Sequence, residues 1–109
     1  MKTEVYCTVL FEGIHCWPEC PFDEVKYLRD PHRHVFYIRA FKKVNHDDRD
    51  VEFIMLKHQI ERYLSTVYPG GEIGRKSCEM LAEELINTFE LSACDVSEDN
   101  ENGAIVRAE

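Results

Sequence analysis

The stretch HRHVFYIRAFKK, residues 32–43, decides the fold, because two histidines lead into a run of aromatic and β-branched residues. Such residues are typical of a strand, which we expect from His34 to Lys43. Residues 3–11, TEVYCTVLF, predict a neighbouring strand with one face formed by Val5, Cys7, Val9 and Phe11. Between the two, EGIHCWPECPFDE (residues 12–24) contains Gly13, Pro18 and Pro21 and is expected to be irregular.

From Asp50 the period of the apolar residues changes to that of a helix. Asp50 is the expected N-cap, and the inward face comprises Phe53, Leu56, Ile60, Tyr63, Leu64 and Val67. Pro69-Gly70-Gly71 should end this helix. A second helix is expected from Ser77, with Leu81, Ala82, Leu85, Ile86 and Phe89 inward. Two short strands, around residues 93–98 and 104–107, follow and are joined by the turn DNENG.

This order of elements, ββααββ, predicts an α+β fold rather than a parallel βαβ sheet. We expect an antiparallel four-stranded sheet with two helices packed on one face. A chain of 109 residues fits a single domain, residues 1–109.

Composition excludes several classes of function. The net charge of −8 and the lack of a basic stripe argue against binding to a nucleic acid polymer. The five cysteines form no even disulfide framework, which favours reduced thiols and a cytoplasmic location. No apolar window is long enough for a membrane span, so no membrane partner is expected.

Three histidines form the candidate metal site. His32 and His34 lie two apart on one strand and therefore point to the same side. His15 ends the neighbouring strand. Three imidazoles with an open fourth position are an arrangement used by catalytic zinc. On spacing alone, His32 and His34 also fit two exposed polar residues that enter a strand after Pro31. His46 and His58 are expected on the surface.

Five phrases, taken in order, resemble the family of 6-pyruvoyl- and 6-carboxy-tetrahydropterin synthases, which have the tunnelling fold (T-fold). The family's first strand ends in F-x-A-x-H, and its second opens with HGH and an aromatic residue. A V-x-D-F-x-x-L-K phrase leads into the first helix, P-T-x-E starts the second, and V-x-E lies in the third strand. The corresponding segments here are Phe11–His15, His32–Phe36, Val51–Lys57, Lys76–Glu79 and Val96–Glu98.

The resemblance implies that His15, His32 and His34 bind Zn²⁺. It further implies that Glu98 accepts N–H groups from a guanine-like ring, for which a carboxylate is suited because it takes two parallel donors. Glu79 is a further candidate ligand contact, although an acid in the first turn of a helix also favours the dipole. Arg33 replaces the glycine of HGH and should point away from the metal. With Arg29, Arg75 and Lys76 it could form a cationic rim for phosphate groups, or all four could be ordinary surface residues.

Two features of these synthases are missing. The residues before His32, KYLRDP, contain no cysteine, and the segment between the helices, STVYPGGEIGRK, contains neither the Asp nor the His of the family's proton relay. Proton transfer needs such a group in contact with the substrate. Whether the chain is an enzyme therefore stays open at this point.

Three functions fit these observations. The first expectation is a binding protein that sequesters a purine- or pterin-like, nucleotide-derived small molecule, as a phage-type inhibitor of nucleotide signalling would do. The alternative is a zinc-dependent lyase of the pterin-synthase type. The third is an interaction module with a contact loop around Trp17, Pro18 and Pro21. The resemblance also implies a homo-oligomer, a trimer or a hexamer, with ligand sites between subunits.

Overall fold

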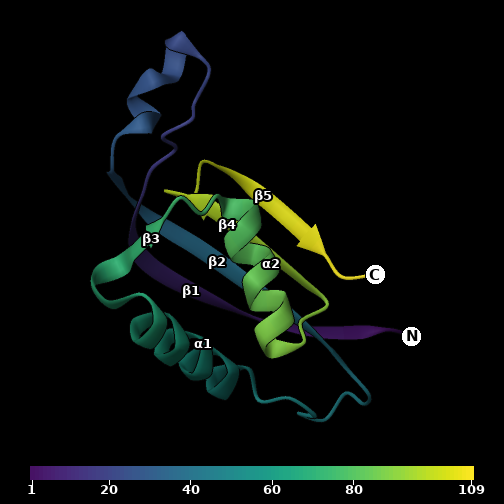
Figure 1. The fold of residues 1–109 in the computed structure, drawn as a ribbon. Coiled ribbons are helices and arrows are strands. Elements are labelled where there is room, and N and C mark those ends of the chain that lie inside the picture. Colours follow the sequence, from purple (N-terminus) through teal and green to yellow (C-terminus); the bar gives the residue numbers. More distant parts are fainter.

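A long β-hairpin organises the structure, a computed structural model that describes residues 1–109 (Figure 1). Its strands, β1 (Thr3–His15) and β2 (His32–Val44), pair in antiparallel fashion along their whole length. The irregular chain expected from residue 12 is a wrong prediction up to His15. Gly13 stays in the strand because it lies opposite His34, and the Phe36 ring fills the space beside it. A Cβ at Gly13 would lie 2.7 Å from Phe36 Cε2.

The remaining elements follow the predicted order, with additions. Three short elements were not expected from the sequence: the 3₁₀ segments η1 and η2 and the strand β3. The elements are η1 (Asp23–Arg29), α1 (Phe53–Val67), η2 (Pro69–Gly71), β3 (Glu72–Gly74), α2 (Cys78–Phe89), β4 (Ala93–Glu98) and β5 (Asn102–Arg107).

The sheet has five strands in the order β3-β1-β2-β4-β5, so the predicted four-stranded, wholly antiparallel sheet is incomplete. The extra strand, β3, runs parallel to β1 and pairs with it only at Ile14 and His15. Three residues are too few to show the alternation by which strands are found in a sequence. Its position still matters, because it holds the chain that leads into α2 against the end of β1 that carries His15.

Both α-helices cover one face of the sheet (Figure 1). α1 contributes Leu56, Ile60 and Leu64 to the core, and α2 contributes residues such as Leu81 and Leu85. The predicted inward face of α1 is wrong at its ends, where Phe53 and Val67 are 48% and 45% exposed. They are the first and last residues of the helix, and spacing alone did not reveal their exposure.

Each α-helix is capped at its N-terminus by a side chain. The second helix begins next to Ser77, where it was expected to start, and Ser77 caps it, since its Oγ accepts the backbone N–H of Met80. For α1 the predicted cap, Asp50, is wrong. Glu52 caps the helix by accepting the N–H of Ile54 at 2.8 Å, while Asp50 accepts the N–H of Asn45 in the preceding turn. None of the helices has both the length and the apolar character needed to cross a membrane.

Residues 16–31 form an arm that connects β1 to β2 and extends beyond the sheet (Figure 1). Trp17 N–H donates to Leu28 O at 2.6 Å and closes the base of the arm. Phe22 and Tyr27 are 58% and 65% exposed, whereas the Cys20 side chain is buried within the arm. The arm directly joins His15 to His32, the first two residues of the predicted cluster.

Candidate metal centre

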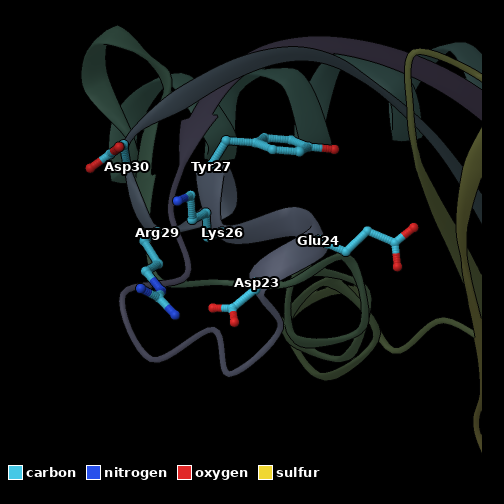
Figure 2. Close-up of a pocket in the computed structure, with 6 residues that line it drawn as sticks. All are labelled: Asp23, Glu24, Lys26, Tyr27, Arg29 and Asp30. Atoms are coloured by element: carbon cyan, nitrogen blue, oxygen red, sulfur yellow. The ribbon is translucent and has the colours of Figure 1, made fainter.

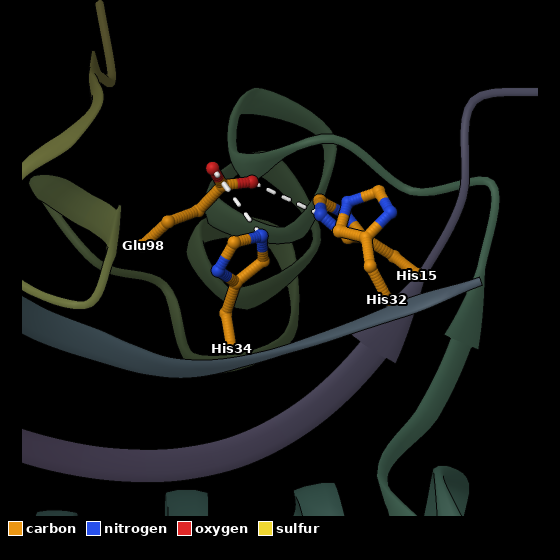
Figure 3. A group of neighbouring side chains, drawn as sticks. All are labelled: His15, His32, His34 and Glu98. Atoms are coloured by element: carbon orange, nitrogen blue, oxygen red, sulfur yellow. Dashed lines mark ion pairs between the residues drawn. The ribbon is translucent and has the colours of Figure 1, made fainter. Parts of the chain in front are cut away.

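The register of three strands brings four chemically active side chains together. His15 lies opposite His32, and His34 lies opposite Gly13 on the same hairpin. Glu98, the last residue of β4, lies opposite Phe36. Residues that face one another in an antiparallel pair point to the same side, here the side covered by the helices. The potential ligand atoms of the three histidines and Glu98 all lie within 4.8 Å of one another (Figure 3).

Each imidazole is oriented through its Nδ1 atom. His15 Nδ1 lies 2.9 Å from the carbonyl oxygen of Lys76, and His32 Nδ1 lies 2.8 Å from that of Asp30. His34 Nδ1 lies 2.7 Å from Oδ2 of Asp99. All three acceptors are oxygens that can only accept, so each Nδ1 carries the hydrogen and donates. In the neutral ring, the Nε2 atom is therefore left with a free lone pair.

These three Nε2 atoms are buried and have no hydrogen-bond partner. A buried polar atom without a partner costs on the order of 1–3 kcal/mol, and native proteins contain few of them. Three that converge on one point are therefore the strongest chemical signal in the molecule. A metal ion coordinated by these Nε2 atoms would give each of them a partner. The oxygens that accept from Nδ1 are contacts of the kind that usually orient histidine ligands of a metal.

Glu98 occupies the fourth side of the cluster. Its Oε2 lies 3.0 Å from His15 Nε2, and its Oε1 lies 3.6 Å from His34 Nε2. Neither contact is a hydrogen bond, and the second is too long for one. A carboxylate oxygen this close to a nitrogen lone pair is repelled unless a proton or a metal ion lies between them. A metal ion would satisfy all three Nε2 atoms and Glu98 together, which separate protons would not do.

The four residues could hold a metal ion. Zinc bonds of about 2.0–2.1 Å in tetrahedral geometry separate the ligand atoms by roughly 3.4 Å. The two distances from Glu98 to the imidazoles, 3.0 and 3.6 Å, lie on either side of that value. Three imidazole nitrogens and one carboxylate oxygen are also a donor set that suits zinc.

Asp99 contacts the cluster and was not predicted from the sequence as a site residue. Its Oδ2 accepts from His34 Nδ1 and its Oδ1 accepts from Val35 N–H at 3.0 Å, while its own N–H donates to Val35 O. The hydrogen bond from His34, followed by that from Val35, holds the pKa of Asp99 below its ordinary value. Asp99 thus joins the β4–β5 turn to β2 and fixes Glu98 and His34 relative to each other. Its position directly after Glu98 was the available signal.

Phe36 forms the floor of the cluster. Its side chain is fully buried and its ring meets those of His15 and His34 edge to face, with centroids 5.2 and 5.8 Å apart. The missing side chain at Gly13 leaves room for that ring. The cluster is consequently packed from below by an apolar residue and approached from above by Glu98, whose side chain is 29% exposed.

The remaining predicted site residues lie outside the cluster. Arg33 is exposed and lies between His32 and His34 on the strand, so it points to the opposite face as expected. Glu79 is exposed in the first turn of α2. Two members of the proposed cationic rim are paired with acids, Arg75 with Glu19 and Lys76 with Glu84.

The Cys78 thiol, near the cluster, is protonated and therefore a poor base. Cys78 is buried at the start of α2, and burial, followed by the charges of Glu98 and Glu79, raises its pKa to about 12. It therefore stays protonated at neutral pH. The Cys20 thiol is enclosed in the arm near the carbonyl oxygens of Phe22 and Val25.

A hollow in the arm is a further feature that could be mistaken for a site (Figure 2). Its side chains carry charges of both signs and point in different directions, so they do not converge on one ligand. The lining residues are Asp23, Glu24, Lys26, Tyr27, Arg29 and Asp30.

Comparison with known proteins adds no assignment, since no family model matches the chain and no curated protein matches it. The geometry of the histidine cluster therefore has to carry the functional argument.

Proposed function

We propose that this chain is a zinc-binding protein of the tunnelling-fold type that holds a purine- or pterin-like, nucleotide-derived small molecule beside the metal and sequesters it. The observation that carries the proposal is the convergence of three buried Nε2 lone pairs, each already fixed by a hydrogen bond at Nδ1. His15, His32 and His34 would hold the ion. A zinc ion in such a site supplies a Lewis-acid position that attracts ligand oxygens.

Glu98 supports the choice of ligand class. Its carboxylate lies beside the histidines with 29% of the side chain exposed, so it can be reached by an incoming molecule. In the ligand-free chain it completes the cluster, and in the proposed complex it accepts the adjacent N–H donors of a guanine-like ring. A carboxylate binds such an edge with two parallel hydrogen bonds.

Sequestration is favoured over the synthase reaction because the cysteine and the Asp-His pair of those synthases have no counterparts in the matching segments of this chain. Cys78, with its pKa raised to about 12, is not a thiolate at neutral pH, and only the thiolate would act as a base. The Asp99 carboxylate is engaged by His34 and Val35.

The proposed assembly is a homo-oligomeric ring of the tunnelling-fold type. The sheet has unpaired edges along β5 and along the part of β1 before Ile14, where the short edge strand β3 does not reach. Unpaired edges of this kind readily join another sheet. The face without helices also exposes Tyr6, Leu10 and Ile105 at 56–57%. These features support association of several copies, edge to edge.

Native mass spectrometry of protein purified without chelator tests the metal, the assembly and the retained ligand together. We expect one zinc ion per chain, an oligomer, and a nucleotide-like compound released unchanged on denaturation. His32→Ala should lose the metal, whereas the control His58→Ala, at an exposed position on α1, should keep it. A wild-type chain that carries no zinc, and takes up none when zinc is added, would refute the proposal. Chemical conversion of the compound would instead favour the synthase.

A further inference from the structure

His15 depends on a polar network between the two helices. Its ring is oriented by one hydrogen bond, from Nδ1 to the backbone carbonyl of Lys76. Lys76 lies in the short connection between β3 and α2, outside regular secondary structure. Its own N–H makes only a long bond, 3.3 Å, to Ile73 O. The flanking residues Gly74, whose carbonyl accepts the Cys16 N–H, and Ser77, the cap of α2, restrain the backbone at Lys76, and the anchoring of the Lys76 side chain adds a further restraint on its carbonyl.

The Lys76 side chain is held by Glu84. Its Nζ lies 2.8 Å from Oε1 of Glu84, which is on α2 and has only 18% of its side chain exposed. The same carboxylate accepts the hydroxyl groups of Tyr63 at 2.6 Å and Tyr68 at 2.5 Å, both from α1 or its C-cap. Three donors thus surround one carboxylate and fix it between the helices.

The pKa values of Lys76 and Glu84 are shifted in the directions expected for an ion pair with close hydrogen bonds. The hydrogen bond to Glu84 is the main cause that raises the pKa of Lys76. Burial tends to raise the pKa of Glu84, but the bonds from Lys76, Tyr63 and Tyr68 outweigh it and leave the pKa below its ordinary value. An ion pair and hydrogen bonds therefore connect α1, through Glu84, to Lys76, whose backbone carbonyl oxygen orients His15.

We propose that Glu84 is a positioning residue for the metal centre, which acts through the Lys76 carbonyl on the tautomer and orientation of His15. The inference rests on the proposed function in that His15 is taken as a metal ligand. It adds a residue that touches neither metal nor ligand. It also couples the packing of α1 against α2 to the affinity of the site.

The test compares Glu84→Gln and Lys76→Met with the control Glu83→Gln, an exposed acid one position earlier on the same helix. The first measurement is made on metal-free protein, as ¹H–¹⁵N correlations of the His15 ring. We expect a single Nδ1–H tautomer in the wild type and in the control. Both network variants should show a mixture of tautomers while they remain folded by circular dichroism.

The second measurement is the zinc affinity by competition with a chelator, together with the absorption spectrum of the Co²⁺-substituted protein. Loss of an outer contact to a histidine ligand weakens metal binding by about 10- to 100-fold, and we expect the lower part of that range here. The double variant should bind no more weakly than either single variant, since both break one connection.

Variants that lower the free energy of unfolding but keep the wild-type His15 tautomer and zinc affinity would overturn the inference and leave Glu84 a purely structural role. If the wild-type chain binds no zinc, the proposed function fails. The tautomer measurement on the metal-free chain still decides whether Glu84 positions His15.

Discussion

Asp99→Asn is the sharpest perturbation of the metal centre, because it changes one atom. In the wild type, Oδ1 of Asp99 accepts from Val35 N–H and Oδ2 accepts from His34 Nδ1–H. An asparagine can replace only one of these acceptors. If its oxygen stays on Val35, its amide group faces the Nδ1–H of His34, and two donors then oppose each other.

The structure predicts how the ring responds. His34 can relieve the conflict by moving its proton to Nε2, which removes the lone pair that faces the cluster. The backbone adds no strain of its own, since Asp99 has a left-handed φ of 56° that asparagine also adopts readily. A carboxylate-to-amide change behind a histidine fixes the wrong tautomer in the same way in serine proteases. We expect zinc affinity to fall by about 10- to 100-fold.

The assay is chelator competition at pH 7.5, with Glu101→Gln as the control. Glu101 is exposed in the same turn and its substitution removes the same charge. The ¹H–¹⁵N spectrum of the metal-free variant should show His34 with its proton on Nε2. Equal zinc affinity for Asp99→Asn and the control would refute the reasoning, since charge near the site rather than the tautomer would then govern binding.

Three further predictions follow from the same contacts. Glu98→Ala should weaken zinc binding more than Asp99→Asn does, because it removes a candidate ligand rather than an outer contact. The d–d absorption spectrum of the Co²⁺-substituted protein should also change shape, and an unchanged spectrum would exclude Glu98 as a ligand. Gly13→Ala should destabilise the fold by about 1–3 kcal/mol in urea unfolding, since the new Cβ would lie 2.7 Å from Phe36 Cε2, and wild-type stability would contradict the tight fit. Burial, followed by the hydrogen bond to a carboxylate, raises the pKa of Tyr68 to about 12, above roughly 10 in the unfolded chain. The folded state favours the protonated phenol, so this contribution is present below pH 10 and is lost between about pH 10 and 12; Tyr68→Phe should flatten the fall of unfolding free energy in that interval, and identical profiles would refute it.

The sequence predicted the core elements because their periodicity is strong. Residues such as Ile60 and Leu85 recur at helical spacing and are fully buried, and both helices and the four longer strands were expected in the observed order. The short strand β3 was not predicted because it has only three residues, pairs with β1 at two positions and buries a single side chain, Ile73. One buried residue is too few to show an alternating pattern.

The site, like the fold, was predicted from the sequence only in part. The expected metal ligands, His15, His32 and His34, come together because they lie on one hairpin, where residues opposite and two apart share a face. Glu98 was expected to anchor a ring, and its place inside the cluster depends on the register between β2 and β4. That register is a tertiary property, which a single sequence does not encode locally.

The groups that orient the histidines come from three unrelated parts of the chain. They are a carbonyl before α2, a carbonyl at the end of the arm and a carboxylate in the β4–β5 turn. Two of the three are backbone atoms, so their identity as residues carries no chemical signal. Only the complete fold places all three at once, and for that reason the affinity for metal should report on the integrity of the whole domain. If the cluster binds zinc as proposed, tight binding requires the segment before α2, the end of the arm and the β4–β5 turn to be in place together, because each of them contacts one imidazole.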